Sequence, residues 1–262
     1  MENEHEAIES TVPELPNFIT LILRSFHGSN WAELLHDWDS IIFAVIIAGL
    51  IAILFYFGTR NNRLIPSGMQ NFLELIVHNL RSLVVGVLGT EGDKYLPFLG
   101  TLFIYILCMN LAGMVPFMKS PSSNINITAA LGICVFIYVQ FLNFWNMGVG
   151  GYFYHLAGSP KNLTEWLIAP LMFPIELLIQ LSRPVTLALR LFGNVLGEDI
   201  LIAAFALFGI GMVASFNSPV GLPLQVPFML LGILTSLMQA LVFTLLTTVY
   251  ILLSMPHKKE DH

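Results

Sequence analysis

Residues 184–197, PVTLALRLFGNVLG, place one arginine in a run of apolar and small side chains. Only Thr186 and Asn194 are polar among the neighbours of Arg190 in this run. A charged side chain at bilayer depth costs from about 2.5 to more than 10 kcal/mol, so a residue of this kind is by default functional. We therefore expect Arg190 to be part of the functional site, within a membrane-embedded segment.

The composition is that of an integral membrane protein. Of the 262 residues, 56% are hydrophobic and 11% are charged, whereas soluble domains carry roughly 25% charged residues. The net charge of -6 is concentrated in residues 1–40, which hold eight acids and one base. This start lacks the basic n-region of a cleavable signal peptide. We expect an acidic extracytoplasmic segment over 1–39 and one membrane domain over 40–262.

Apolar runs predict an all-α membrane protein with five membrane-embedded helical segments. A spanning helix needs about 20 mostly apolar residues. The expected segments are 41–58, 96–117, 125–147, 164–216 and 224–255. The last two are too long to cross a hydrocarbon core of about 30 Å upright, since a helix rises about 1.5 Å per residue. We expect them to form a long tilted hairpin, preceded by a loop over 148–162.

A further helix, 67–88, is expected to lie along one membrane surface. Ser67 and Gln70 have the spacing of a capping box, which opens helices. The polar residues recur at helical spacing on one face: Gln70, Glu74, His78 and Arg81. Apolar residues surround the rest of this helix, a pattern typical of an interfacial amphipathic helix.

Basic residues favour an N-terminus outside and a C-terminus in the cytoplasm. If the loop 60–94 is cytoplasmic, seven Lys and Arg residues fall on that side and two on the other. This is the asymmetry that the positive-inside rule describes. The remaining two bases, Arg183 and Arg190, stay within the membrane-embedded segments.

Arg190 shares one helix face with other polar residues. At 100° per residue, six of them lie within about 80° of it: Glu176, Gln180, Arg183, Thr186, Asn194 and Glu198. Asp199 falls on the opposite face, so the two adjacent acids are expected to meet different surroundings. Glu176 and Arg183 fit a structural contact between helices as well as a functional role. For Arg190 we favour function, because no acid lies close to it toward the centre of the segment.

Gln239 is the large polar residue of the last segment, three and four residues after Ser236 and Thr235. One interpretation is a hydrogen bond between membrane helices, which contributes about 0.6–2 kcal/mol. We favour a functional contact with the polar face of Arg190 across the hairpin. Three other threonines are expected to bond back to their own helix: Thr244, Thr247 and Thr248.

Residues 190–194, RLFGN, in an overlong helix with prolines, resemble subunit a of the F-type ATP synthases. Residues 109–116 resemble the NL.G..P helix end of that family, and 124–128 its N-x-N-x-T helix start. Gln70 and Glu74 resemble its amphipathic segment. The residues after the arginine and the long N-terminal extension are closest to bacterial or plastid members. We expect a multi-pass protein of a bacterial cell inner membrane rather than a thylakoid.

The resemblance implies a stator subunit with two aqueous half-channels that carry protons to and from a carboxylate on a rotating ring of c subunits. Arg190 corresponds to the arginine that separates the half-channels. A guanidinium keeps its own proton and draws a nearby carboxylate into its ionised form. Asn194 and Gln239 correspond to polar positions near it, and Glu176 to an acid on the exit path. The supporting polar residues are Gln180, Arg183, Thr235 and Ser236.

The relay acid is where the chain departs from the family. Nine residues after the arginine many members carry glutamate or histidine, and here the residue is Asp199. The histidine that some members carry seven residues before the glutamine is Gly232 here. Glu198 lies beside Asp199, so either acid is a candidate relay, and the resemblance favours Asp199. Asp199→Asn is then expected to slow passive proton conduction more than Glu198→Gln.

The implied partners are the c ring, the peripheral stalk subunit b, the other synthase subunits and the lipid bilayer. No cofactor, metal or nucleic acid is expected. The sequence has no HExxH and no GxxxxGK[ST] motif, so nucleotide chemistry belongs to partner subunits and the chain alone has no catalytic chemistry. The alternative is a secondary transporter with proline-broken helices, although the two halves show no internal repeat. The choice between H⁺ and Na⁺ depends on the ring.

Overall fold

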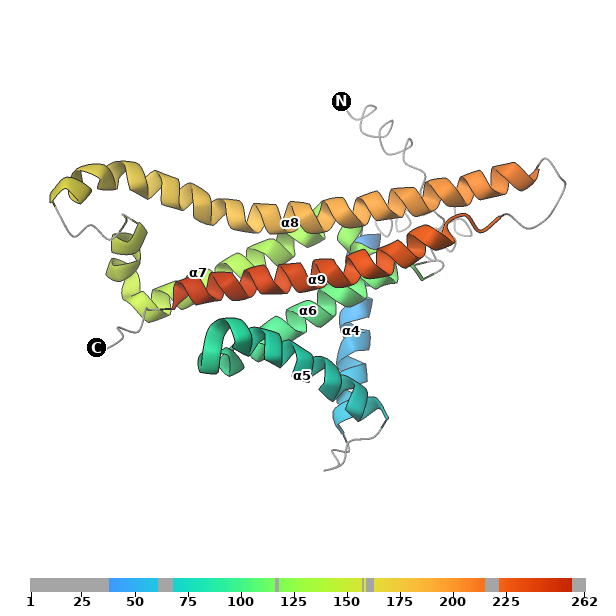
Figure 1. Cartoon of the computed structure of the whole chain (residues 1–262), viewed down its shortest axis with the longest axis horizontal. Helices are drawn as coiled ribbons and strands as arrows, with labels where there is room; N and C mark the ends of the chain where they lie inside the picture. The colour runs from blue at the N-terminus through green and yellow to red at the C-terminus, as the bar shows by residue number, and fades with distance from the viewer. Residues whose placement is uncertain are drawn as a thin grey trace. The chain divides into compact units, whose positions relative to one another are not determined.

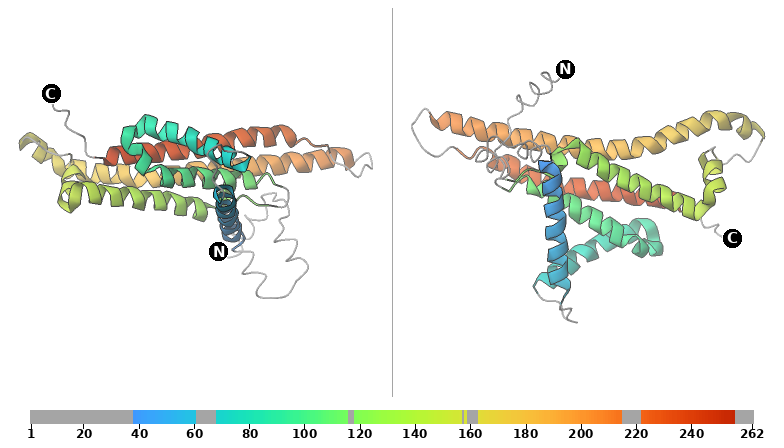
Figure 2. Two further views of the ribbon diagram at one scale, coloured as in Figure 1. Left: turned by 90° about the horizontal axis from the view of Figure 1, so that it is seen from below. Right: turned by 180° about the vertical axis from the view of Figure 1, so that it is seen from behind.

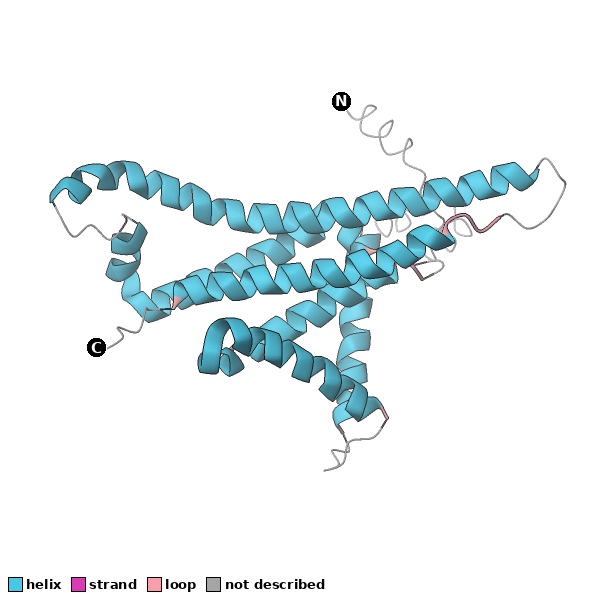
Figure 3. Ribbon diagram, viewed as in Figure 1, coloured by secondary structure: helices cyan, strands magenta, loops and turns pink. Residues whose placement is uncertain are grey.

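The computed structural model describes residues 38–60, 68–115, 118–156, 158, 163–214 and 222–255. Within these ranges every regular element is a helix, as Figures 1 and 3 show. The elements are α4 (Asp39–Thr59), α5 (Met69–Leu88), η1 (Gly89–Lys94), α6 (Leu96–Ala112), η2 (Pro121–Ser123), α7 (Ile125–Leu156), α8 (Leu163–Ala214) and α9 (Val226–Ser254). The predicted all-α fold is confirmed. Most of the acidic segment 1–39, and Ser67, lie outside the described residues.

Five described helices are long and apolar enough to cross a membrane, judged by length and composition. They are Asp39–Thr59, Met69–Lys94, Ile125–Gly148, Pro170–Met212 and Val226–Ser254. The set differs from the predicted one, because α6 has 17 residues and ends at Ala112 rather than at 117. In its place, the helix that begins with α5 is apolar enough to qualify. The multi-pass membrane class is confirmed, and the interfacial position of α5 stays a prediction.

In helix α5 the buried apolar residues and the polar residues lie on different faces, as predicted. Its buried residues recur at spacings of seven and four: Leu73, Leu80, Val84 and Leu88. On the exposed side, Gln70 Nε2 donates a 2.7 Å hydrogen bond to Glu74 Oε1. Arg81 donates two hydrogen bonds of 2.7 and 2.8 Å to the carboxylate of Asp93, which ties α5 to η1. The side chains thus separate into an apolar and a polar face, as an amphipathic helix requires.

Packing divides the chain into two compact units. Unit 1 comprises Met1–Asn62, Ile104–Ile127 and Leu191–Leu241, and unit 2 comprises Arg63–Phe103, Thr128–Arg190 and Val242–His262. Among the described elements, unit 1 contains α4, η2, most of α6, the second part of α8 and the first part of α9. Unit 2 contains α5, η1, the first part of α6, nearly all of α7, the first part of α8 and the end of α9.

In unit 1, the start of α4 is fixed to the connection between α6 and α7. Asp39 is 5% exposed, and its Oδ2 lies 3.6 Å from Lys119 Nζ. Ser40 Oγ donates a 2.9 Å hydrogen bond to Asp39 Oδ1. Tyr105 Oη on α6 donates to the carbonyl of Ala44 at 3.3 Å. Pairing of the buried carboxylate offsets its loss of hydration, and the first turn of α4 is thereby anchored.

The hairpin of α8 and α9 exists and both helices are overlong, as predicted. Helix α8 has 52 residues and contains Pro170, Pro174 and Pro184, and α9 has 29 residues. At about 1.5 Å per residue these lengths are roughly 78 and 44 Å, more than the hydrocarbon thickness. In unit 1 the two helices meet through Phe205 and Phe228, whose rings stack with centroids 4.0 Å apart. The tilt against the membrane stays a prediction.

Helix α7 continues beyond the point where the sequence predicts a loop. The predicted loop 148–162 is wrong for its first part, because α7 extends to Leu156. At Gly148 the backbone has φ 70° and ψ 165°, a conformation that glycine tolerates. The helix changes direction there, as Figure 2 shows for its C-terminal part. It resumes because Tyr152 and Leu156 are buried in unit 2.

Candidate functional site

Arg190 lies within α8 and its side chain is exposed. Within the described residues it makes no side-chain hydrogen bond and no ion pair. A guanidinium is always charged, and in a membrane-embedded helix its charge calls for a compensating group. The described part of the chain does not supply that group.

Asn194 and Gln239 join α8 to α9 within unit 1. Asn194 Nδ2 donates a 2.8 Å hydrogen bond to Gln239 Oε1. Gln239 is 4% exposed, and its Nε2 has no hydrogen-bond partner among the described residues. The predicted contact across the hairpin is therefore confirmed, and it leaves one amide donor buried and unused.

Glu198 also faces α9. Thr235 Oγ1 donates a 2.9 Å hydrogen bond to Glu198 Oε2, so the predicted supporting threonine contacts an acid directly. The carboxylate lies in the space beside Gly232, where an added Cβ would overlap Glu198 Oε1 and the terminal methyl of Met114. Because residue 232 has no side chain, the carboxylate of Glu198 on α8 can pack against α9 at this position.

Asp199 faces a different part of unit 1. Its Oδ1 lies 3.1 Å from the point that a Cβ on Gly113 would occupy, and the Cβ of Ser120 lies 2.9 Å from the same point. Ser120 Oγ in turn donates to the carbonyl of Met109 at 3.0 Å. Asp199 therefore lies against the end of α6 and the connection that follows it. The prediction that the two adjacent acids meet different surroundings is confirmed.

Buried polar atoms without a partner are found in unit 1. Among the described residues these atoms are Asn110 Nδ2 and Oδ1, Ser122 Oγ, Ser236 Oγ and Gln239 Nε2. Most buried polar groups in proteins are hydrogen-bonded, so such a group calls for a functional explanation. Ser236 and Gln239 were predicted site residues, whereas Asn110 entered the sequence argument only as part of a family motif.

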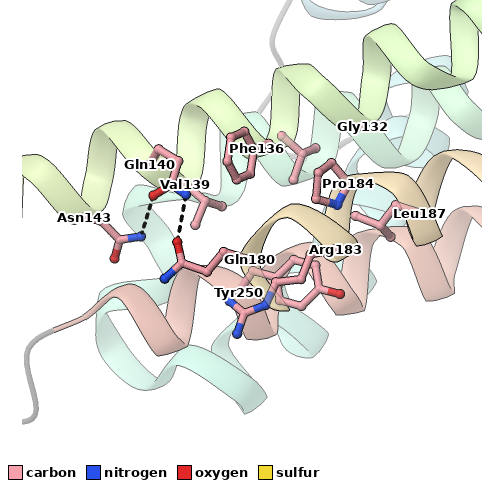
Figure 4. A pocket seen from close by; sticks show the side chains of 11 residues that line it. Gly132, Phe136, Val139, Gln140, Asn143, Gln180, Arg183, Pro184, Leu187 and Tyr250 are labelled. Carbon is pink, nitrogen blue, oxygen red and sulfur yellow. Dashed lines mark hydrogen bonds between the residues drawn. The ribbon is translucent and has the colours of Figure 1, made fainter. Parts of the chain in front are cut away.

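A second polar cluster lies in unit 2, around Gln180. Its Oε1 accepts hydrogen bonds from Gln140 Nε2 at 2.9 Å and from Tyr152 Oη at 2.8 Å. Asn143 Nδ2 donates to Gln140 Oε1 at 3.3 Å, and Figure 4 shows these amides beside one another. The α7 partners were missed by sequence reasoning. Gln140 and Asn143 are three residues apart and so share a helix face, which was the available signal.

Arg183 and Glu176 do not pair with each other in the described part of the chain. The guanidinium carbon of Arg183 lies 5.0 Å from the centre of the Tyr250 ring, which is a cation–π contact between α8 and α9. Thr186 Oγ1 donates to the carbonyl of Arg183 at 2.9 Å. Glu176 is half-buried. Arg183 therefore makes a structural contact between helices, but its partner is the Tyr250 ring and not the carboxylate of Glu176.

Two of the threonines on α9 bond back to their own helix, as predicted. Thr247 Oγ1 donates to the carbonyl of Phe243 at 2.9 Å, and Thr248 Oγ1 to that of Thr244 at 2.7 Å. These bonds satisfy the hydroxyls locally.

The family model described as "ATP synthase A chain" matches residues 41–252. The match begins in the first turn of α4 and extends into the last turn of α9, so it includes both polar clusters. The chain belongs to the ATP synthase A chain family. Membership confirms the resemblance found in the sequence and replaces the secondary transporter alternative. It makes the chain a multi-pass membrane subunit of an ATP synthase, in the stator part of the membrane sector.

Relatives match over 81 to 99% of this chain. The "ATP synthase subunit a" of Protochlamydia amoebophila is 62% identical over 259 residues, which is 99% of this chain and 95% of the relative. "ATP synthase subunit a 3" of Pelobacter propionicus is 38% identical over 81% of this chain and 86% of its own length. "ATP synthase subunit a" of Trichlorobacter lovleyi is 37% identical over 88% and 95%. The similarity thus extends beyond the part that the family model matches.

Proposed function

We propose that this subunit carries protons to and from a carboxylate on a rotating c ring, with Arg190 between the two routes. The observation that carries the proposal is the exposed guanidinium of Arg190, which has no partner in the described part of the chain. A ring carboxylate that approaches it loses its proton, because the neighbouring positive charge stabilises the ionised form. Arginine does not give up its own proton, so it blocks direct passage between the routes.

The inlet route lies in unit 1, along Asp199, Glu198, Asn194 and Gln239. Its support is that two carboxylates and several buried unpaired polar atoms lie on the elements that pack together there. Asp199 lies by the α6–α7 connection, which the basic-residue count places outside. Glu198 lies against α9. The two acids then act one after the other, Asp199 on the outer side and Glu198 on the α9 side.

The exit route begins in unit 2, where Glu176 supplies the carboxylate. Glu176 is half-buried on α8, one turn from Gln180. Gln180, held by Gln140 and Tyr152, lines this side of the helix with groups that accept and donate hydrogen bonds. Arg183 and Thr186 continue the polar face toward Arg190 along the sequence of α8.

The partners and the setting follow from the same proposal. The c ring lies against α8 and α9, subunit b anchors the chain to the stalk, and nucleotide chemistry belongs to other subunits. The membrane is the inner membrane of a bacterial cell. The acidic segment 1–39 and the N-terminus are outside, the C-terminus is cytoplasmic, and α5 lies along one membrane surface. The basic residues support this orientation.

The test is Arg190→Gln in the complete synthase reconstituted into vesicles. The variant should assemble and should make no ATP under an imposed proton gradient, because the ring carboxylate keeps its proton. Arg81→Gln is the matched control, since Arg81 is exposed and paired with Asp93 outside the site. Near-normal ATP synthesis by the Arg190→Gln complex would contradict the proposal. The same vesicles under a sodium gradient would establish the coupling ion.

A further inference from the structure

A pocket in unit 2 is formed by α7, α8 and α9. Part of its α7 wall is apolar, with Val135, Phe136 and Val139, and one end is polar, with Gln140 and Asn143 of α7 and with Gln180 and Arg183 of α8. Figure 4 shows Phe136, Val139, Gln180 and Arg183 around the pocket, with Tyr250 beside Arg183. The pocket thus combines an apolar groove with hydrogen-bond donors at its end.

The charge in this pocket is positive. Arg183 makes no ion pair among the described residues, and its guanidinium rests on the Tyr250 ring at 5.0 Å. Gln180 is 6% exposed, and its Oε1 already accepts two hydrogen bonds, so its amide N–H groups are the part left to donate. The pocket is therefore complementary to an anion, and guanidinium groups bind phosphate well.

The polar end of the pocket lies near the ends of two candidate membrane spans. The candidate span of α9 ends at Ser254, and that of α7 ends at Gly148. These ends are level, because Asn146 Nδ2 donates to the carbonyl of Ser254 at 3.4 Å. Tyr250 precedes Ser254 by one turn, about 6 Å of helix. Trp145, close to the end of the α7 span, is 78% exposed, as is typical of aromatic side chains at a membrane interface.

We propose that this pocket binds an anionic phospholipid, with its phosphate on Arg183 and Gln180 and an acyl chain along the apolar side of α7. Basic pockets between membrane helices are known sites for anionic headgroups. The amphiphilic lining matches both parts of such a molecule. The site shares Gln180 and Arg183 with the polar face of the proposed exit route, but it does not depend on the proposed role of Arg190.

The test uses the reconstituted synthase in phosphatidylcholine vesicles that contain a trace of photoactivatable lipid. The reactive diazirine is on the acyl chain, and the headgroup is either phosphatidylglycerol or phosphatidylcholine. Crosslinks are mapped by mass spectrometry. In the unaltered protein, phosphatidylglycerol should label residues 132–143 several-fold more than phosphatidylcholine. Arg183→Gln should reduce that labelling roughly five-fold, which corresponds to the loss of about 1 kcal/mol for one basic residue.

Two further variants keep the result interpretable. Arg183→Lys retains the charge and should retain most of the labelling, and it replaces Arg183→Gln if that variant fails to assemble. Arg81→Gln should leave the labelling unchanged. Equal labelling by both lipids, no labelling of this segment, or undiminished labelling in Arg183→Gln would overturn the proposal. Loss of labelling on addition of inorganic phosphate would assign the site to the free ion instead.

Discussion

The polar residues of unit 1 and unit 2 are arranged in different ways. In unit 1, Glu198 bonds across α8 and α9, Asp199 faces the α6–α7 connection, and several buried polar atoms stay without partners in the described part of the chain. In unit 2, Gln180 accepts from two residues of α7, and Arg183 rests on an aromatic ring. Only carboxylates exchange protons readily near neutral pH in such a setting. Substitutions of the acids Glu198 and Asp199 in unit 1 should therefore change conduction, and those of the hydrogen-bonding residues around Gln180 should mainly change packing.

The largest expected effects come from the two acids of unit 1. Asp199→Asn should slow passive proton conduction through the membrane sector by about a hundredfold, the low end of what a proton-transfer group contributes. Glu198→Gln should slow it less, by about tenfold. Proton flux into vesicles stripped of the catalytic sector measures both. If Glu198→Gln is the more damaging change, the main relay is Glu198.

Gly232→Ala should have an intermediate effect. A Cβ at this position displaces the Glu198 carboxylate and the methyl of Met114, both at the ends of flexible side chains, so the fold accommodates it. Alanine is also a better helix former than glycine by about 1 kcal/mol. Conduction should fall by about fivefold while thermal stability is unchanged or slightly higher.

A control and a rescue complete the Gly232 experiment. Gly100→Ala adds a methyl group where no other atom lies within 4 Å, and it should leave conduction unchanged. Glu198→Asp shortens the acid by one methylene and should recover part of the loss in the Gly232→Ala protein. Full conduction in Gly232→Ala alone would show that the position of the Glu198 carboxylate is unimportant.

The smallest expected effect on conduction is that of Tyr152→Phe in unit 2. The change removes one donor to Gln180 and keeps the ring, which lies 4.6 Å from that of Phe144. Stability of the assembled complex should fall by about 0.6 kcal/mol, the average for a hydrogen bond between membrane helices. Conduction should stay within about twofold of normal. Tyr138→Phe serves as the matched control, and a large loss of conduction in Tyr152→Phe alone would place its hydroxyl on the ion route.

Periodicity and length were sufficient to predict most of the fold. The bounds of α8 and α9 differ from the predicted segments by one or two residues, because long apolar runs admit no other structure in a bilayer. The end of α6 and the continuation of α7 past Gly148 were not predictable in this way. Both depend on tertiary packing, such as the burial of Tyr152, which the local pattern does not report.

The candidate site was predictable where it follows one helix and less so where it joins two. A rotation of 100° per helical residue predicted that Glu198 and Asp199 lie on different faces of the helix. The structure places them in different surroundings. The partners of Gln180 were missed, because they lie on another helix whose rotation the sequence leaves open. The space beside Gly232 was missed for the same reason. It depends on how closely α8 and α9 approach each other.

The central claim is that the partner of Arg190 is a carboxylate on another subunit. A structure of this chain with its c ring tests that claim most directly, through the distance from the guanidinium to the nearest ring carboxylate. We predict a distance within about 4 Å, that of an ion pair, or one bridged by a single water molecule. A separation of more than about 10 Å, or an ion pair of Arg190 with an acid of its own chain, would contradict the claim.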